Sequence, residues 1–366
     1  MDDYLRKLIA SKRDKKITYS EYIEAALYAP EIGYYMKPGT KIGRSGDFYT
    51  TSNIHNVFGA CLGRWIAKAI REKQLAPGII EIGGGTGKLA FDILSSLKRL
   101  DSELFERLTY TIVDSSPFHQ SEQKERLAEF TNVTFLKELP ESLEFTGVIF
   151  SNELFDALPV HVIEKKQGVL YEVFIKEQDG RLSETIELLS DSRIQEYIKS
   201  QSIDLAENQR FEVPLKMVEM IFTISSTLTK GIMVTFDYGY TQVEWSEPVH
   251  RHGSLRGYYR HQLFEDILQY PGKMDMTTHI HFDALQHYGE RVGLRFEALQ
   301  SQADFLIQAG LLSELEDHQN LDPFSEIAKR NRAIRSLVIP GGISSYFRVM
   351  LQSKGMKEIE KNIFTE

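Results

Sequence analysis

The stretch Ile-Ile-Glu-Ile-Gly-Gly-Gly-Thr-Gly, residues 79–87, predicts a β-strand that runs through a glycine turn into a helix. Its three isoleucines are typical of a buried strand, and the apolar residues after Gly87 recur at helical spacing as far as Leu97. Glycine lets the backbone approach a ligand closely, and the N-terminus of a helix directs its N–H groups toward that ligand. We therefore expect a ligand-binding turn here; the alternative is a turn without a ligand.

The spacing of the glycines excludes two common nucleotide-binding turns. A dinucleotide turn needs a glycine where Lys88 stands, and a phosphate-binding P-loop needs a glycine where Ile82 stands. What remains is one acid followed by three alternating glycines: Glu81, Gly83, Gly85 and Gly87. This pattern resembles motif I of class I S-adenosylmethionine (SAM) methyltransferases. The resemblance implies SAM as the cofactor and these four residues as part of its binding site.

The composition of the chain indicates a globular protein. Its 366 residues are 42% hydrophobic, which suffices for two domains or one elaborated α/β domain. Lys+Arg 43 against Asp+Glu 52 gives a net charge of −9, which disfavours general nucleic-acid binding. The single cysteine, Cys61, excludes an internal disulfide. Since neither a targeting pattern nor a membrane-spanning run is present, we expect a cytoplasmic protein that does not bind membranes.

Strand and helix patterns alternate from residue 79 onward, which predicts a doubly wound parallel sheet. Strands are expected at 79–82, 109–113, 133–136, 147–151, 232–236, 295–300 and 346–352, and helices at 88–100, 283–292 and from 303. Asp114 closes the second strand, where a sheet of this kind holds the hydroxyls of a ribose. Capping of the following helix is the alternative role for Asp114.

The loop Asn-Glu-Leu-Phe-Asp-Ala-Leu-Pro, residues 152–159, follows the fourth strand at the same sheet edge. Methyl transfer requires that a lone pair be positioned in line with the methyl group and that the acceptor lose its proton. We expect Glu153 and Asp156 to orient a cationic nitrogen acceptor. Asn152 is expected to hold the site beside SAM, and Asp237 or Tyr238 to line it. Helix capping by Asn152 and exposure of the two acids are the alternative.

Two regions lie outside the predicted sheet. Residues 1–75 are expected to form a helical extension with a lid, in which Asp47 and Phe48 stand in a glycine-flanked loop that could fold over a ligand or be a solvated turn. Residues 76–366 are expected to form the methyltransferase domain, with insertions at about 160–210 and 240–282. The insertions include a hairpin at 160–176, and an amphipathic helix is predicted at 212–228. His279 and His281 are weak evidence for a metal, and we expect no metal site.

Taken together, the chain resembles the MidA family of SAM-dependent methyltransferases, whose mitochondrial members are assembly factors of respiratory complex I. The resemblance rests on motifs spread over nearly the whole chain: Y-A-P-E-I-G-Y-Y-M, G-D-F-Y-T, E-I-G-G-G-T-G, I-V-D-S-S-P, N-E-L-F-D-A-L-P, D-Y-G-Y, L-R-G-Y-Y-R-H, T-T-H-I-H-F and Q-A-D-F-L-I-Q-A-G. It implies a Rossmann-like, mixed seven-stranded sheet with added helical and hairpin elements. It also implies methylation of a protein arginine, SAM contacts by the glycine motif and Asp114, and a lid formed with Asp47 and Phe48; from its place in the loop, we expect Asn152 to contact SAM as well.

Two positions depart from the family pattern. The family continues G-D-F-x-T with S-P-E, where this chain has Thr51, Ser52 and Asn53, and an aspartate of the late motif is replaced by His281. If those two acids bind the acceptor guanidinium, the substrate has changed or been lost. We predict a SAM-dependent methyltransferase that acts on a protein arginine nitrogen. The alternatives are a small-molecule N- or O-methyltransferase and a SAM-binding assembly factor with little transfer activity.

Overall fold

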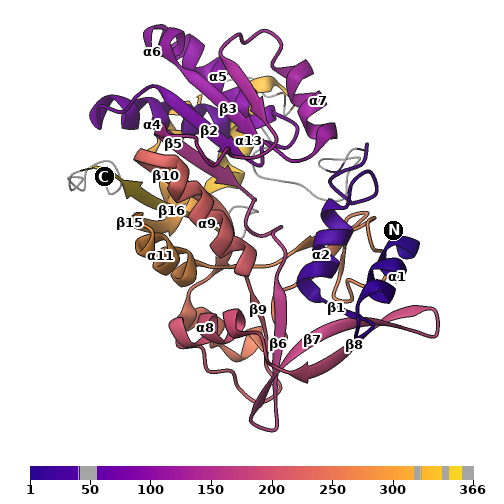
Figure 1. Ribbon diagram of the computed structural model, residues 1–366. Helices are drawn as coiled ribbons and strands as arrows, with labels where there is room; N and C mark the ends of the chain where they lie inside the picture. The colour runs from indigo at the N-terminus through magenta and orange to yellow at the C-terminus, as the bar shows by residue number, and fades with distance from the viewer. Residues whose placement is uncertain (40, 42–55, 317–321, 323, 340–345, 357–366) are drawn as a thin grey trace. The chain divides into compact units, whose positions relative to one another are not determined.

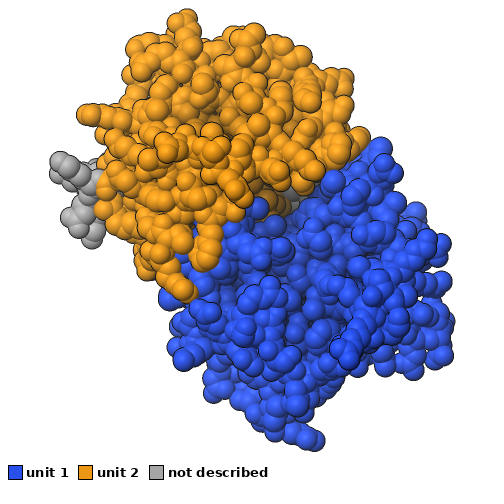
Figure 2. Space-filling model, in the orientation of Figure 1, with its two compact units in different colours: residues 1–48, 155–221, 239–288 blue, residues 49–154, 222–238, 289–366 orange. Residues whose placement is uncertain are grey.

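The computed structural model describes residues 1–39, 41, 56–316, 322, 324–339 and 346–356 (Figure 1). The chain forms two compact units, each assembled from three separate segments and coloured separately in Figure 2. Unit 1 comprises Met1–Phe48, Phe155–Ile221 and Gly239–Tyr288, and unit 2 comprises Tyr49–Leu154, Phe222–Tyr238 and Gly289–Glu366. The boundary expected near residue 75 lies inside unit 2, because helix α4 (Val57–Glu72) shares the core of that unit. The division into domains stays a prediction.

Unit 2 is built on a mixed sheet. Its strands lie in the order β15 (Arg295–Ser301), β16 (Phe347–Lys354), β10 (Leu228–Tyr240), β5 (Phe145–Asn152), β2 (Gly78–Ile82), β3 (Thr109–Val113) and β4 (Val133–Leu136). The last five are mutually parallel, and β16 runs antiparallel to both β10 and β15. A short strand, β14 (Ile280–His281), pairs with the end of β10. The expected seven-stranded α/β fold is confirmed.

One face of this sheet is covered by helices with which it shares a hydrophobic core. Alternate residues of the central strands, such as Ile79, Val148 and Val234, project into that core because side chains along a strand alternate between its two faces. The helices that complete the core are α4, α5 (Lys88–Leu100), α12 (Gln302–Gln308) and α13 (Glu326–Val338). Two further helices, α6 (Ser102–Arg107) and α7 (Pro117–Arg126), flank β3 along the chain. The central strands β2, β5 and β10 are thereby mostly buried, whereas β4 and β15 are only partly buried.

Unit 1 contains a five-stranded antiparallel sheet. Its strands are β1 (Lys16–Thr18), β7 (Val169–Gln178), β6 (His161–Lys166), β9 (Arg210–Val213) and β8 (Arg181–Leu188), the last pairing with β7. Helices α1 (Asp2–Ser11) and α2 (Tyr19–Tyr28) share a core with this sheet, and α8 (Ser192–Ser200) follows β8 along the chain. The N-terminal helices and the first predicted insertion therefore share one core.

The second predicted insertion belongs to unit 1 as well. It forms a three-stranded sheet of β11 (Arg256–Tyr259), β12 (Gln262–Phe264) and β13 (Asp275–Thr277), preceded by the short helices α10 (Gln242–Trp245) and η1 (Pro248–His250). Helix α11 (Phe282–Arg291) follows it, and η2 (Leu311–Glu314) lies later in unit 2. Met274 and Met276 extend from the small sheet into the core that contains Leu5 and Tyr22. None of the helices in the described part of the chain is both long and apolar enough to cross a membrane.

The single helix expected at residues 212–228 is wrong at both ends. Residues as far as Val213 belong to β9, and helix α9 (Leu215–Thr227) begins only after Pro214, whose missing N–H cannot continue a strand ladder. Glu212 accepts backbone N–H bonds from Ser254 and Leu255, which fixes it in the extended strand. Leu228 already belongs to β10, where it pairs with Phe145. Contacts with residues distant in the sequence therefore determine where helix α9 begins and ends.

Candidate cofactor site

The glycine turn follows β2 in unit 2 and opens helix α5. The backbone of Gly85 and Gly87 lies in the left-handed region, with φ of +49° and +73°, where a side chain would strain the chain. A Cβ added at Gly87 would approach Cγ of Gln123 to 3.1 Å, whereas one added at Gly85 would meet no described atom within 4 Å. The main chain at Gly85 therefore borders open space, which is what a closely approaching ligand requires.

Asp114, at the end of β3, is hydrogen-bonded to the glycine turn. Its Oδ2 accepts a hydrogen bond from the backbone N–H of Gly85 at 3.0 Å, and its Oδ1 accepts one from the N–H of Ser116 at 2.9 Å. Gln123 supports the same arrangement, since its Nε2 donates to the Gly85 carbonyl at 2.8 Å. Ser116, not Asp114, caps α7, because its hydroxyl accepts from the N–H of His119. The Asp114 carboxylate therefore holds the glycine turn in place and does not cap α7.

Glu81 lies within the sheet under the glycine turn. It is 3% exposed, and the hydroxyl of Tyr110 donates to its Oε2 at 2.8 Å. Burial raises the pKa of Glu81 to about 8; the Tyr110 hydrogen bond opposes this increase, and the negative charge of Asp114 adds to it. A Cβ added at Gly84 would lie 3.7 Å from the carboxyl carbon of Glu81, so the carboxyl group lies beside the glycine turn. Its neutral form is therefore favoured in the folded chain, compared with an exposed glutamate.

The loop after β5 lies at the same edge of the sheet. Ser151 is the register partner of Ile82, so Asn152 and Gly83 leave neighbouring strands at the same level. Asn152 donates through Nδ2 to Oε1 of Glu153 at 3.1 Å, while its buried Oδ1 has no hydrogen-bond partner among the described residues. The side chain of Leu154 packs against Gly83. A buried acceptor without a partner, next to open space at Gly85, fits a ligand that carries N–H or O–H donors.

Glu153 holds a backbone conformation that is uncommon for residues other than glycine. Its φ is +53°, and its N–H donates to the carbonyl of Phe236 on β10 at 3.0 Å. Such strained conformations persist where the surroundings fix them, and they are common at functional sites. Asp237 follows Phe236 and is fully buried, and its Oδ1 accepts from the N–H of Tyr238. The structure therefore brings Asn152, Glu153 and Asp237 together at this edge.

The other predicted residues lie elsewhere. Asp156 belongs to unit 1, where its carbonyl accepts from the N–H of Thr278 at 2.9 Å. His281 is buried in the same unit with its Nδ1 2.8 Å from the Tyr197 hydroxyl, and burial lowers the pKa of His281 to about 4. Over the described ranges, no three His, Cys, Asp or Glu residues are grouped so as to hold a metal ion. Asp47 and Phe48 lie outside the described residues.

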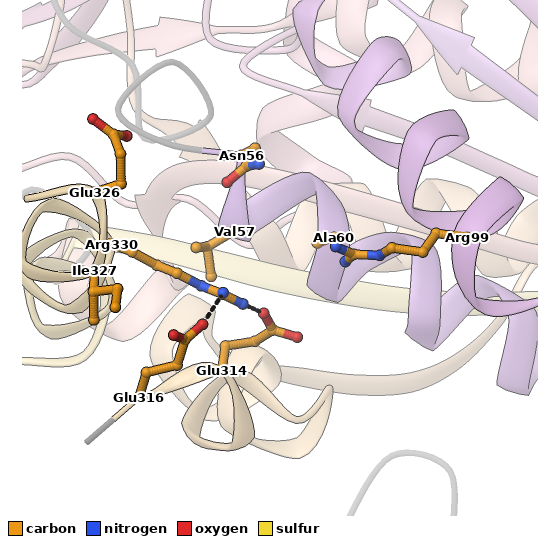
Figure 3. A pocket seen from close by; sticks show the side chains of 9 residues that line it. All are labelled: Asn56, Val57, Ala60, Arg99, Glu314, Glu316, Glu326, Ile327 and Arg330. Carbon is orange, nitrogen blue, oxygen red and sulfur yellow. Dashed lines mark hydrogen bonds and ion pairs between the residues drawn. The ribbon is translucent and has the colours of Figure 1, made fainter. Parts of the chain in front are cut away.

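A cavity of about 310 Å³ is present in unit 2, but none of its lining residues belongs to the glycine turn (Figure 3). Three of its charged side chains form ion pairs with one another: Arg330 contacts both Glu314 and Glu316. Glu314 also contacts Arg64. The cavity therefore contains an ion-pair cluster of its own, and the glycine turn stays the predicted cofactor site.

The sequence analysis did not select Tyr110 or Gln123 as site residues. Strand alternation could have placed Tyr110 beside Glu81, and helical periodicity gives the position of Gln123 along α7. Tyr110 is the register partner of Ile79, and Ile79 and Glu81 project from the same face of β2, so the tyrosine comes to lie beside the acid. Gln123 lies seven residues after Ser116, about two helical turns along α7. From this position its side chain reaches the Gly85 carbonyl in the glycine turn. Both side chains support the site without belonging to the glycine motif.

This geometry is that of a class I methyltransferase: a mixed sheet with five parallel strands, a glycine turn after one of its central strands and an acid at the end of the neighbouring strand. A family model described as "Putative S-adenosyl-L-methionine-dependent methyltransferase" matches residues 61–299. The chain belongs to this family, and SAM is its cofactor. The resemblance to the MidA family is thereby confirmed.

Two groups of known proteins are similar to the chain. "Protein arginine methyltransferase NDUFAF7 homolog, mitochondrial" of Drosophila melanogaster is 26% identical over 307 residues, 76% of this chain and 67% of that protein. The Danio rerio protein of the same name, without "homolog", is 26% identical over 302 residues, 74% and 68% of the two chains. A COG1565 superfamily member from Burkholderia thailandensis, crystallised with S-adenosyl-homocysteine (SAH), is 29% identical with a TM-score of 0.89, covering 99% of this chain and 94% of that one.

The expected cytoplasmic location is wrong on this comparison. The curated relatives from Drosophila melanogaster and Danio rerio carry mitochondrial names. The expectation had rested on the absence of a targeting pattern in the first residues of the chain, and such a pattern is only one of the features that decide location.

Proposed function

We propose that the chain transfers the methyl group of SAM to a nitrogen of a protein arginine. The observation that carries this proposal is the joining of Asp114 to Gly85 next to the Asn152 loop, at one edge of the sheet in unit 2. The names of the similar NDUFAF7 proteins support arginine as the acceptor residue.

The residues of unit 2 divide the work of cofactor binding. The backbone at Gly83, Gly85 and Gly87 leaves room for the cofactor, and Asp114 accepts hydrogen bonds from ribose hydroxyls while it holds the turn. Glu81 supplies a carboxyl group next to the turn. Asn152 presents its buried Oδ1 to a donor of the cofactor. Asp47 and Phe48 remain a predicted lid.

Bound SAM supplies an electrophilic methyl group, and the chain must position the acceptor and remove its proton. Glu153 is assigned to orient the acceptor nitrogen and accept hydrogen bonds from it, because Asn152 fixes its carboxylate and its strained backbone is fixed at Phe236. Asp237 lines the site from the end of β10. Asp156 is assigned to orient the acceptor side chain.

The test is incubation of the purified full-length chain and methyl-labelled SAM with a lysate from cells that lack the gene. We expect a labelled protein whose acid hydrolysate contains methylarginine, and no such label with the Glu153→Gln variant, which should still bind SAH. Label only in small molecules would assign a small-molecule acceptor. Tight SAH binding with no labelled product at all would instead favour an assembly factor.

A further inference from the structure

The antiparallel sheet of unit 1 has a long edge strand, β8 (Figure 1). It pairs with β7 over its whole length, from Arg181 opposite Gln178 to Leu188 opposite Tyr171, without a bulge. In the described part of the chain, the backbone hydrogen bonds of residues 181–188 all run to β7. Alternate residues of an antiparallel strand direct their N–H and C=O groups to opposite sides. The outer edge of β8 therefore presents a row of backbone donors and acceptors to a further strand.

This edge lacks the features that keep most edge strands from pairing with another chain. Such strands are short, contain a bulge, or carry lysine or proline. β8 has eight residues, none of which is lysine or proline. Its two acids already have partners in unit 1: Arg210 donates to Glu184 at 2.8 Å, and Lys16 forms an ion pair with Glu187. The charge of both carboxylates is therefore balanced before another strand approaches.

The sequence of β8 is complementary to itself in an antiparallel register. A two-fold axis perpendicular to the sheet keeps each face of the sheet on its own side, so the numbers of opposite residues are both even or both odd. With Thr185 on the axis, threonine lies opposite threonine, and Leu182 lies opposite Leu188 of the second copy on each side. The remaining pairs each join an acid to an uncharged residue: Ser183 with Glu187, and Glu184 with Ile186. No like charges lie directly opposite each other, and pairs of this kind stabilise a sheet.

Burial of Leu188 favours this register over its neighbours. Leu188 is 64% exposed, although it lies on the same face of β8 as Ile186, which packs against the core of unit 1. In the register centred on Thr185, Leu188 covers Leu182 of the second copy, and the symmetry makes this contact twice. The register centred on Glu184 would place two carboxylates directly opposite each other, which is unfavourable.

We propose that the edge of β8 binds β8 of a second copy of the chain, antiparallel and centred on Thr185, so that two five-stranded sheets join into one. Main-chain hydrogen bonds supply the attraction, as in other cases of strand addition, and the side-chain pairs set the register. β8 contains none of the residues assigned to SAM or to the methyl acceptor. The contact is therefore separate from methyl transfer.

The experiment is sedimentation equilibrium of the full-length chain at concentrations up to about 100 µM. We expect the wild type to form a dimer. Thr185→Lys and Thr185→Asp each place like charges opposite each other on the axis, so each should raise the dissociation constant of the dimer at least about tenfold. An equimolar mixture of these two variants should recover the dimer, because lysine then lies opposite aspartate. Thr134→Lys, at an exposed position of the edge strand β4 in unit 2, is the matched control and should keep the dimer.

Leu188→Ser is a second variant for the case in which a Thr185 variant does not fold. It changes an exposed side chain and removes both leucine contacts, so we expect the dimer to weaken at least about tenfold. Calorimetric titration with SAH checks that each variant is folded. A monomeric wild type would overturn the proposal and leave the edge to an extended segment of another protein. A dimer that withstands both Thr185→Lys and Leu188→Ser, or folded Thr185 variants whose mixture stays monomeric, would overturn it as well.

Discussion

The carboxylate of Asp114 accepts a hydrogen bond from the backbone N–H of Gly85, with 3.0 Å between Oδ2 and the nitrogen. This bond joins the end of β3 to the glycine turn after β2. A second bond, from Gln123 to the Gly85 carbonyl, holds the same peptide from α7. The turn is therefore fixed by side chains of the protein, which reduces the ordering that cofactor binding must impose.

Removal of this carboxylate should weaken cofactor binding more than its effect on folding explains. We expect Asp114→Ala to lower the free energy of unfolding by about 1–3 kcal/mol, because buried N–H groups lose their acceptor. SAH affinity measured by calorimetry should fall by at least about tenfold. Asp101→Ala is the control: this aspartate caps α6 through the N–H of Leu104 and should affect stability without changing SAH affinity. Equal SAH affinity in the two variants would contradict the role of Asp114.

Glu81 should make stability depend on pH in an unusual direction. Burial raises its pKa from the usual 4.5 of a glutamate to about 8 in the folded chain. Between these values the folded state binds more protons than the unfolded state, so the free energy of unfolding falls as pH rises, by at most about 1.4 kcal/mol per pH unit. The contribution is fully present below the unfolded pKa and is lost through pH 8.

The Glu81→Gln variant isolates this contribution. Glutamine keeps the shape and cannot ionise, so the difference in unfolding free energy between variant and wild type should grow in favour of the variant from pH 5 to pH 8. Urea unfolding at three pH values in this range measures it. A difference that stays constant or changes in the opposite direction would show that Glu81 is ionised in the folded chain.

The ion pairs of the cavity in Figure 3 should serve stability and not cofactor binding. Glu314 lies between Arg64 and Arg330, and its side chain is 9% exposed. Glu314→Gln removes the carboxylate that Arg64 and Arg330 share and leaves Arg330 with Glu316 alone, which should cost about 3–5 kcal/mol in urea unfolding. The exposed Glu326, on the rim of the same cavity, is the control, and Glu326→Gln should change stability by less than about 0.5 kcal/mol. If Glu314→Gln abolished SAH binding in a folded chain, the cofactor site would have to be placed in this cavity.

The parts of the fold that depend on local pattern were predictable from the sequence. The expected ranges of β3, β4 and α5 coincide with the observed ones, since strand and helix periodicity and the glycine turn all act within a few residues. The strand at residues 210–213 was not predictable in this way. Its Glu212 is held by Ser254, which is 42 residues further along the chain. The same long-range dependence explains why β8 was missed, although the Asp179-Gly180 turn before it is a hairpin signal.

The candidate site shows the same division. Its glycines and the acid at the end of β3 could be read from spacing, but the bond between Asp114 and Gly85 depends on how two strands align. His281 was read as a possible change of substrate, yet it lies in the core of unit 1 against Phe211 and Tyr197. The residues next to a histidine in a strand do not indicate whether its side chain is buried. Only the fold could therefore distinguish a substrate-contacting His281 from one packed in the core.

The central claim is that the open space at Gly85 receives SAM, and a matched pair of glycine variants tests it most directly. Gly85 and Gly168 both have positive φ, of +49° and +74°, and a Cβ added at either meets no described atom within 4 Å. Valine should therefore strain the backbone at both positions, but only Gly85→Val places a side chain where the cofactor binds. In calorimetric titrations with SAH we predict that Gly168→Val binds like the wild type and that Gly85→Val, still folded by circular dichroism, shows no binding. Wild-type affinity in a folded Gly85→Val variant would contradict the account.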